Sequence, residues 1–185
     1  MDIVETVQIE SSEKIGKITY DECAVSPREW DNLGTMICEH KQYTLGDENS
    51  LDFSECENWE DVEKEIKKEY GRDCIMLPLY LYDHSGITMN TSGFSCGWDS
   101  GRVGTIVVDR ATIRKEFNTK RVTAKLKNQI LKQLKSEVEV YDKYISGKVY
   151  SYSIEDMFGN VFDSCSGYYG LDETIQVVKN VLNEF

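Results

Sequence analysis

Apolar residues recur at helical spacing in several stretches of the chain. The strongest stripe runs over residues 121–146, and another over residues 59–70 follows Asn58, a residue type that caps helices. Asp109 is a second candidate cap, for a short helix that ends near Phe117. The apolar positions on the longer faces, including that of a last helix, are Val62, Ile66, Tyr70, Leu126, Ile130, Leu134, Val138, Tyr141, Ile145, Leu171, Ile175, Val178 and Leu182. The spacing predicts three to four helices.

Other segments alternate between apolar and polar residues, or are short and almost wholly apolar, as strands are. Residues 75–82 are the best candidate for the centre of a sheet, although Pro78 lacks a hydrogen-bond donor and favours a bulge or an edge position. Residues 149–154 and 161–165 flank a turn glycine and predict a β-hairpin. The remaining predicted strands are residues 15–20, 34–38 and 105–108.

These elements together predict an α+β fold, with three to four helices packed against an antiparallel or mixed sheet of five to six strands. Hydrophobic residues make up 40% of the 185 positions, which is enough for a core without disulfides or metal. No linker or repeat interrupts the chain. We therefore expect a single domain over residues 1–185, in which residues 1–25 form an N-terminal extension.

Charge is abundant and unevenly placed. Thirty-three acidic against 21 basic residues give a net charge of −12, which repels nucleic acids and anionic membranes. We therefore expect neither direct binding of double-stranded DNA nor association with a membrane. Residues 1–74 hold twenty acids and eight bases, whereas residues 110–135 hold nine bases and one acid, Glu116. An acidic surface suits a partner with a basic groove, although the same charge also serves solubility.

The start of the chain lacks the basic end and apolar stretch of a secretion signal, so we expect a cytoplasmic protein. Cys38 and His40 are spaced like a pair of metal ligands, but the second motif that a zinc site needs is missing. We expect no cofactor and no bound metal. The six cysteines, expected to be reduced thiols, are at positions 23, 38, 56, 74, 96 and 165.

Asp83 and His84 directly follow the predicted strand over residues 75–82, and Asp99 lies in the glycine-rich passage downstream. A general-base site could use these residues, and a metal could bind them together with Asp31, but their spacing follows no established motif. The alternative is a simple turn, since Asp, Ser and Gly all favour turns. No phosphate loop, G-x-S-x-G elbow or H-E-x-x-H pattern occurs, so an enzyme is less expected than a binding protein.

An acidic, tyrosine-bearing surface is the main candidate for recognition. Acidic residues are concentrated at positions 55–69, where Lys64, Lys67 and Lys68 partly offset their negative charge. Tyrosine brings a large contact area with a polar tip, although it also suits the rim of a core. The residues expected to bind a partner are Glu55, Glu57, Glu60, Asp61, Glu63, Tyr80, Tyr82 and Trp98. The basic residues 120–135 have no aromatic side chain among them to stack bases, which favours a solvated helix face.

Three motifs are similar to those of one protein family. They read WDNLGTM at residues 30–36, LPLYLYDHSG at residues 77–86 and CGWDSG at residues 96–101. Over residues 26–170 the chain resembles a family of uncharacterised proteins carried by phages, plasmids and integrative elements. The resemblance implies a mobile-element context, in which small acidic proteins inhibit host defence, including CRISPR effectors and restriction enzymes. It implies no catalytic residue.

The leading expectation is a non-enzymatic, anti-CRISPR-like inhibitor, whose acidic surface binds a host effector protein with a basic nucleic-acid-binding groove. A second expectation is a hydrolase of nucleic acid or a nucleotide, in which Asp83 and His84 act with Asp31 or Asp99, with or without a metal. A third is a structural or adaptor protein of the mobile element. Convergence of Asp83, His84 and Asp99 on one pocket would favour the hydrolase.

Overall fold

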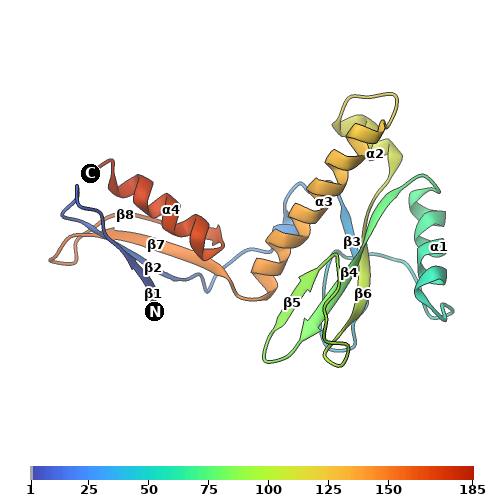
Figure 1. Cartoon of the computed structure of the whole chain (residues 1–185), viewed down its shortest axis with the longest axis horizontal. Coiled ribbons are helices and arrows are strands. Elements are labelled where there is room, and N and C mark those ends of the chain that lie inside the picture. The colour runs from blue at the N-terminus through green and yellow to red at the C-terminus, as the bar shows by residue number, and fades with distance from the viewer. Residues whose placement is uncertain (1) are drawn as a thin grey trace. The chain divides into compact units, whose positions relative to one another are not determined.

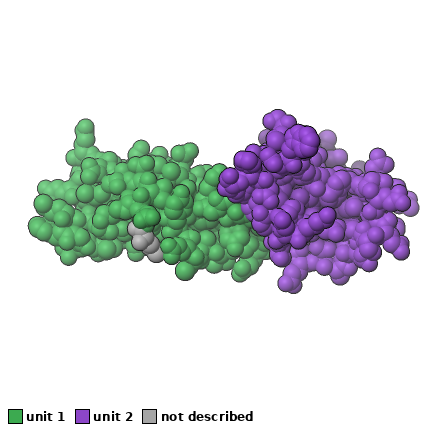
Figure 2. All heavy atoms as spheres, turned by 90° about the horizontal axis from the view of Figure 1, so that it is seen from below, with its two compact units in different colours: residues 1–29, 140–185 green, residues 30–139 purple. Residues whose placement is uncertain are grey.

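The computed structural model describes residues 2–185 and groups the chain into two compact units (Figures 1 and 2). Unit 1 takes in residues 1–29 and 140–185, and unit 2 takes in residues 30–139. Each unit contains one four-stranded sheet, and all strand pairs are antiparallel. The predicted α+β class is confirmed, and the four helices agree with the predicted three to four. The prediction of one sheet with five to six strands was wrong, because eight strands form two sheets, and the single domain stays a prediction.

Unit 1 is a sheet with one helix packed on it. Its strands follow the order β1 (Ile3–Val7), β2 (Ile15–Tyr20), β7 (Val149–Glu155) and β8 (Val161–Tyr169), and its helix is α4 (Leu171–Leu182). Val178 and Leu182 of α4 are fully buried in one cluster with Ile18 and Ile154 of the sheet. The predicted hairpin over 149–165 is confirmed as the β7–β8 pair.

Unit 2 is a sheet with helices on both faces. Its strands follow the order β3 (Thr35–Cys38), β6 (Ser100–Val108), β4 (Ile75–Asp83) and β5 (Ile87–Asn90). Its helices are α1 (Trp59–Tyr70), α2 (Arg110–Glu116) and the part of α3 (Ala124–Ile145) that ends at Glu139. Ile66 of α1 packs against Ile37 and Val107. Leu134 of α3 packs closely on Gly34: a β-carbon added to Gly34 would lie 2.5 Å from the Cδ2 atom of Leu134.

Both predicted helix caps are confirmed. The side chain of Asn58 accepts hydrogen bonds from the backbone N–H groups of Glu60 and Asp61, and Asp109 does the same for Ala111 and Thr112. These bonds satisfy donors that the first turn of a helix leaves free. The helices therefore begin where the sequence places them.

Pro78 occupies an edge position, one of the two alternatives that the sequence allowed for it. The neighbouring strand β5 pairs only with Tyr80–Asp83, so the first half of β4, which holds Pro78, has β6 alone as its partner. An irregularity between Leu79 and Tyr80 separates the two halves. A residue without a donor is tolerated there because no second strand needs its N–H group.

Two strands and a short 3-10 helix, η1 (Pro27–Glu29), were not predicted. Strand β1 lies within the stretch expected to be an extension, and β5 lies within the glycine-rich passage. Strands β6 and β8 also extend beyond their predicted bounds. Within residues 2–185 no helix combines the length and apolarity needed to cross a bilayer, and the six cysteines are free.

Candidate functional site

Three chain segments meet at one end of the unit 2 sheet, which we call the acidic end. The antiparallel pairing brings the ends of β3 and β4 beside the start of β6. The backbone N–H of Asp83 donates to the carbonyl of Asp99 at 2.8 Å, and that of Glu39 donates to the carbonyl of Val103 at 2.9 Å. Side chains far apart in the sequence are thereby held on one rigid support.

Two shallow hollows adjoin at the acidic end, with volumes of about 380 and 520 Å³. Both are lined by His40, Asp83, Arg102 and Val103. The first also contains Trp98 and Asp99, and the second contains Glu39, Lys41 and Trp59 at the start of α1. A concave surface with aromatic and carboxylate groups of this kind suits recognition of a ligand or a protein side chain.

Asp83, His84 and Asp99, the predicted catalytic residues, come together at this end. The Nδ1 atom of His84 lies 3.5 Å from Oδ2 of Asp99, and the Cys96 thiol lies 3.7 Å from the same oxygen. Because the carboxylate faces Nδ1, it can orient the imidazole and leave Nε2 as a base toward solvent. The His84 side chain is 64% exposed, so water reaches this pair freely.

Asp83 is paired with a residue that the sequence did not single out. Its carboxylate accepts a hydrogen bond of 3.1 Å from the Tyr43 hydroxyl, and this bond raises the pKa of Tyr43 above its ordinary value. The Tyr43 ring in turn stacks on His40, with 5.0 Å between ring centroids. The loop after β3 therefore joins the site through Tyr43 and His40.

The aromatic residues predicted to bind also gather here. Trp98 is 98% exposed, the largest exposure among the large apolar side chains described. Tyr82 lies against Phe94, with ring centroids 5.6 Å apart, and it tilts toward His84 at 6.2 Å. Tyr80 pairs across the strands with Arg102. Trp98 is thus free to contact a partner, whereas Tyr80 and Tyr82 are only half-exposed.

Arg102 brings a positive charge to the hollow, but that charge is neutralised locally. Its guanidinium lies 2.9 Å from the carboxylate of Glu63 and 4.7 Å from the centre of the Trp59 ring. The arginine therefore fixes α1 to the sheet. The carboxylates of Glu39, Asp83 and Asp99 then face Lys41 as the remaining cation that lines the hollows.

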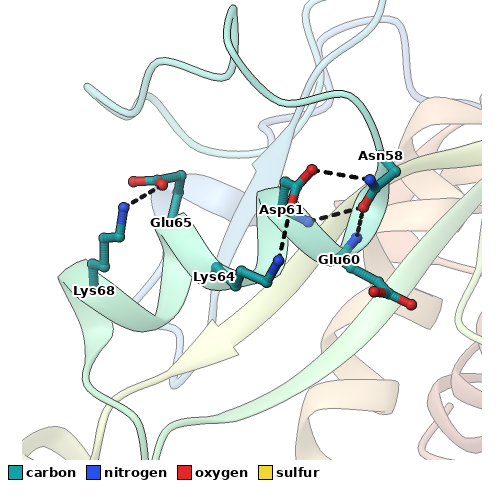
Figure 3. A network of polar contacts seen from close by, with 6 residues as sticks. All are labelled: Asn58, Glu60, Asp61, Lys64, Glu65 and Lys68. Carbon is teal, nitrogen blue, oxygen red and sulfur yellow. Dashed lines mark hydrogen bonds and ion pairs between the residues drawn. The ribbon is translucent and has the colours of Figure 1, made fainter.

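The acidic residues of α1 are largely paired with lysines of the same helix (Figure 3). Lys64 lies 2.8 Å from Asp61, and Lys68 lies 2.5 Å from Glu65. The Lys64 hydrogen bond also lowers the pKa of Asp61. Of the predicted binding acids, Glu55, Glu57 and Glu60 are exposed and make no ion pair within residues 2–185, whereas Asp61 and Glu63 are paired. The negative field at α1 is weaker than its sequence suggests.

Asp31, the remaining candidate for the hydrolase, lies elsewhere. It lines a different hollow, of about 370 Å³, beside Thr112 and Lys115 of α2. Within the described part of the chain, no three His, Cys, Asp or Glu side chains are arranged to hold a metal ion. Comparisons with models of protein families, with curated proteins and with solved structures find no match to this chain.

Proposed function

We propose that this chain is a non-enzymatic inhibitor from a mobile element, which uses the acidic end of unit 2 to occupy the basic nucleic-acid-binding groove of a host defence effector. The observation that carries the proposal is Trp98, which stands almost fully in solvent beside Asp83 and Asp99. Tryptophan is the residue most enriched among those that dominate binding energy in protein interfaces. The resemblance to mobile-element proteins supplies the biological context.

Charge at this end supports a cationic partner. Arg102 is neutralised by Glu63, so the free carboxylates of the hollows outnumber their free cations. The unpaired Glu57 and Glu60 flank Trp59 in the sequence, and Trp59 lines the same hollow. Carboxylates around an aromatic anchor suit a groove lined with lysine and arginine, and such complementarity speeds association.

The test uses a purified RNA-guided DNA nuclease and a purified restriction enzyme as probes, with affinity and DNA cleavage measured at low and high salt. We expect Trp98→Ala to weaken binding by at least about tenfold, and Asp83→Asn with Asp99→Asn to weaken it and flatten its salt dependence. Glu116→Gln with Glu139→Gln removes two exposed carboxylates outside the site and is the matched control. The absence of binding and of inhibition with both probes would overturn the proposal.

A second candidate function, hydrolysis of a phosphodiester, is favoured by the His84–Asp99 pair. In this reaction Asp99 orients the imidazole, and Nε2 of His84 takes a proton from the water whose oxygen bonds to phosphorus. The phosphorus–oxygen bond to the leaving group breaks, and the leaving oxygen takes a proton from solvent water. The aromatic ring of Trp98 beside it is able to stack on a nucleobase. The convergence of the three predicted residues is the observation for this candidate, and their high exposure counts against it, because catalytic groups work best where water is excluded.

Hydrolysis of bis(4-nitrophenyl) phosphate, a chromogenic phosphodiester, distinguishes the two functions. A hydrolase loses about 100-fold or more of its rate in His84→Ala, while Tyr20→Phe, a change at an exposed ring of unit 1, leaves the rate unchanged. An inhibitor shows no turnover above the buffer rate in any of these proteins. If the wild type hydrolyses the substrate and His84→Ala does so at the same rate, His84 takes no part in the chemistry.

A further inference from the structure

The segment that joins α2 to α3, with the first half of α3, carries a dense positive charge. Residues 110–139 hold nine bases and three acids, whereas residues 30–109 hold six bases and sixteen acids. Eight of these bases are exposed and form what we call the cationic surface. They are Arg114, Lys115, Lys120, Arg121, Lys125, Lys127, Lys132 and Lys135.

These cations differ from most others in the chain, because none of the eight makes an ion pair within residues 2–185. Seven lysines and arginines elsewhere in the chain lie within ion-pair distance of a carboxylate. They are Lys17, Lys64, Lys67, Lys68, Arg102, Arg110 and Lys143. The charge of the cationic surface is therefore not consumed within the fold, and it is available to an anionic ligand.

The cationic surface and the acidic end lie toward opposite ends of the unit 2 sheet. Strand β6 begins at Ser100, directly after Asp99, and ends at Val108, just before α2. On α3, Lys125 and Lys132 project away from the buried stripe at 100° per residue, and seven residues place them about 10 Å apart along the helix. Lys125 and Lys132 thus lie one after the other along the helix instead of converging on a single pocket.

We propose that the cationic surface binds the phosphate backbone of a double-stranded nucleic acid without reading its sequence. Exposed cations without ion pairs, spread along the first half of α3 and the segment before it, suit a line of phosphates, whose counterions they release on binding. Phe117 is the one aromatic residue in 110–139 and it is half-buried, so the base stacking that single strands need is missing. None of the exposed large apolar side chains lies in this segment, so it has no anchor for a bilayer.

This proposal replaces the expectation drawn from net charge alone. A net charge of −12 repels DNA at long range, but unit 1, with fourteen acids and six bases, contributes eight of these charges, and unit 2 itself has an acidic end and a cationic surface. Close contact depends on the charges that face the ligand, since the Debye length is about 8 Å at physiological ionic strength. We therefore expect binding that is weak, with a dissociation constant on the order of 10 µM at low salt, and that falls steeply with salt.

The experiment is fluorescence anisotropy with labelled duplex DNA and duplex RNA of one sequence, at about 50 and about 200 mM salt. The test variant combines Lys125→Gln, Lys132→Gln and Lys135→Gln. The control combines Lys64→Gln, Lys67→Gln and Lys68→Gln, which changes the net charge equally but at residues that are ion-paired in α1. We expect the test variant to lose at least about tenfold in affinity and about one unit of salt slope per lysine, and the control to change less than about twofold.

The proposal is supported if either duplex binds and the test variant loses more affinity than the control. The duplex with the higher affinity then identifies DNA or RNA as the source of the phosphates. The absence of an anisotropy change with both duplexes at low salt overturns it, as does an equal loss in the two variants. Two other occupants are tested in parallel by light scattering and by flotation with phosphatidylserine vesicles. The proposal is also overturned if no duplex binds and the wild type self-associates or binds vesicles while the test variant does not. The cationic surface would then bind a second copy of the chain or an anionic membrane.

Discussion

Gly104 shows how one residue sets the spacing of the unit 2 sheet. It lies inside β6 opposite Cys38 of β3, and a β-carbon there would stand 2.2 Å from the carbonyl oxygen of Ile37 and 3.0 Å from the Cα of Cys38. Because these atoms belong to the backbone, no side chain can rotate away to make room. We expect Gly104→Ala to lower the free energy of unfolding by about 1–3 kcal/mol, measured by urea denaturation.

Gly101→Ala is the control for this prediction, since Gly101 lies in the same strand with nothing within 4 Å of its added β-carbon. Its expected change is within about 0.5 kcal/mol. If both variants lost the same free energy of unfolding, the cause would be the general effect of replacing glycine in a strand, and the close approach of β3 to Gly104 would not be the cause.

The same glycine explains one limit of prediction from sequence. Glycine usually marks a turn or a break, so the predicted strand began only at Thr105. The structure continues β6 back through Gly104 to Ser100, because the neighbouring backbone needs the space that a side chain would fill. Asp83 and His84 could be singled out from their place after a predicted strand, and Asp99 from its glycine-rich passage, whereas Tyr43 and Arg102 could not, since only the pairing of distant strands brings them in.

At the scale of elements, the β7–β8 hairpin carries a group whose ionisation couples to folding. The hydroxyl of Tyr152 donates a 2.7 Å hydrogen bond to Asp163, and burial together with this bond raises the pKa of Tyr152 well above its ordinary value of 10.0. The unfolded chain releases this proton near pH 10 while the folded chain keeps it. The contribution to stability is therefore full below pH 10 and is lost as the pH rises toward the folded pKa.

We expect the free energy of unfolding to fall between pH 8 and pH 11 by about 1 kcal/mol for each tyrosine so shifted. In Tyr152→Phe this alkaline loss is smaller by that amount, whatever the variant's stability at pH 8. Ile3→Ala changes an exposed side chain of the same sheet without removing a titrating group and should leave the alkaline loss as in the wild type. Urea denaturation at the two pH values measures all three proteins, and an unchanged loss in Tyr152→Phe would contradict the argument.

Helices were more predictable than sheets for a physical reason. The bounds of α1 match the prediction, because a cap at Asn58 and apolar residues four apart are local signals. Strand pairing is not local: β2 pairs with β7, more than 130 residues later, and that partner excludes β2 from the sheet of β4. The sequence therefore predicted most strands but merged two sheets into one.

At the scale of the whole molecule, the negative charge is shared unevenly between the units. Unit 1 holds fourteen acids and six bases, and unit 2 holds nineteen acids and fifteen bases. The proposed acidic end and cationic surface both belong to unit 2, so most of the net charge lies outside the surfaces proposed to make contact. Charge outside a contact acts through the long-range field, which changes the rate of encounter more than the lifetime of a complex.

This separation leads to a kinetic prediction for the complex with a nuclease. Glu10→Gln, Glu13→Gln and Glu184→Gln combined neutralise three carboxylates of unit 1, and we expect them to lower the association rate severalfold at low salt and to leave the dissociation rate unchanged. Trp98→Ala should do the reverse, because it removes a contact and almost no field. Surface plasmon resonance at about 20 and about 500 mM salt measures both rates, and the difference between the triple variant and the wild type should vanish at the higher salt, where the Debye length falls to a few ångströms. A faster dissociation in the triple variant would instead mean that unit 1 itself touches the partner, and the binding surface would then have to be redrawn to include it.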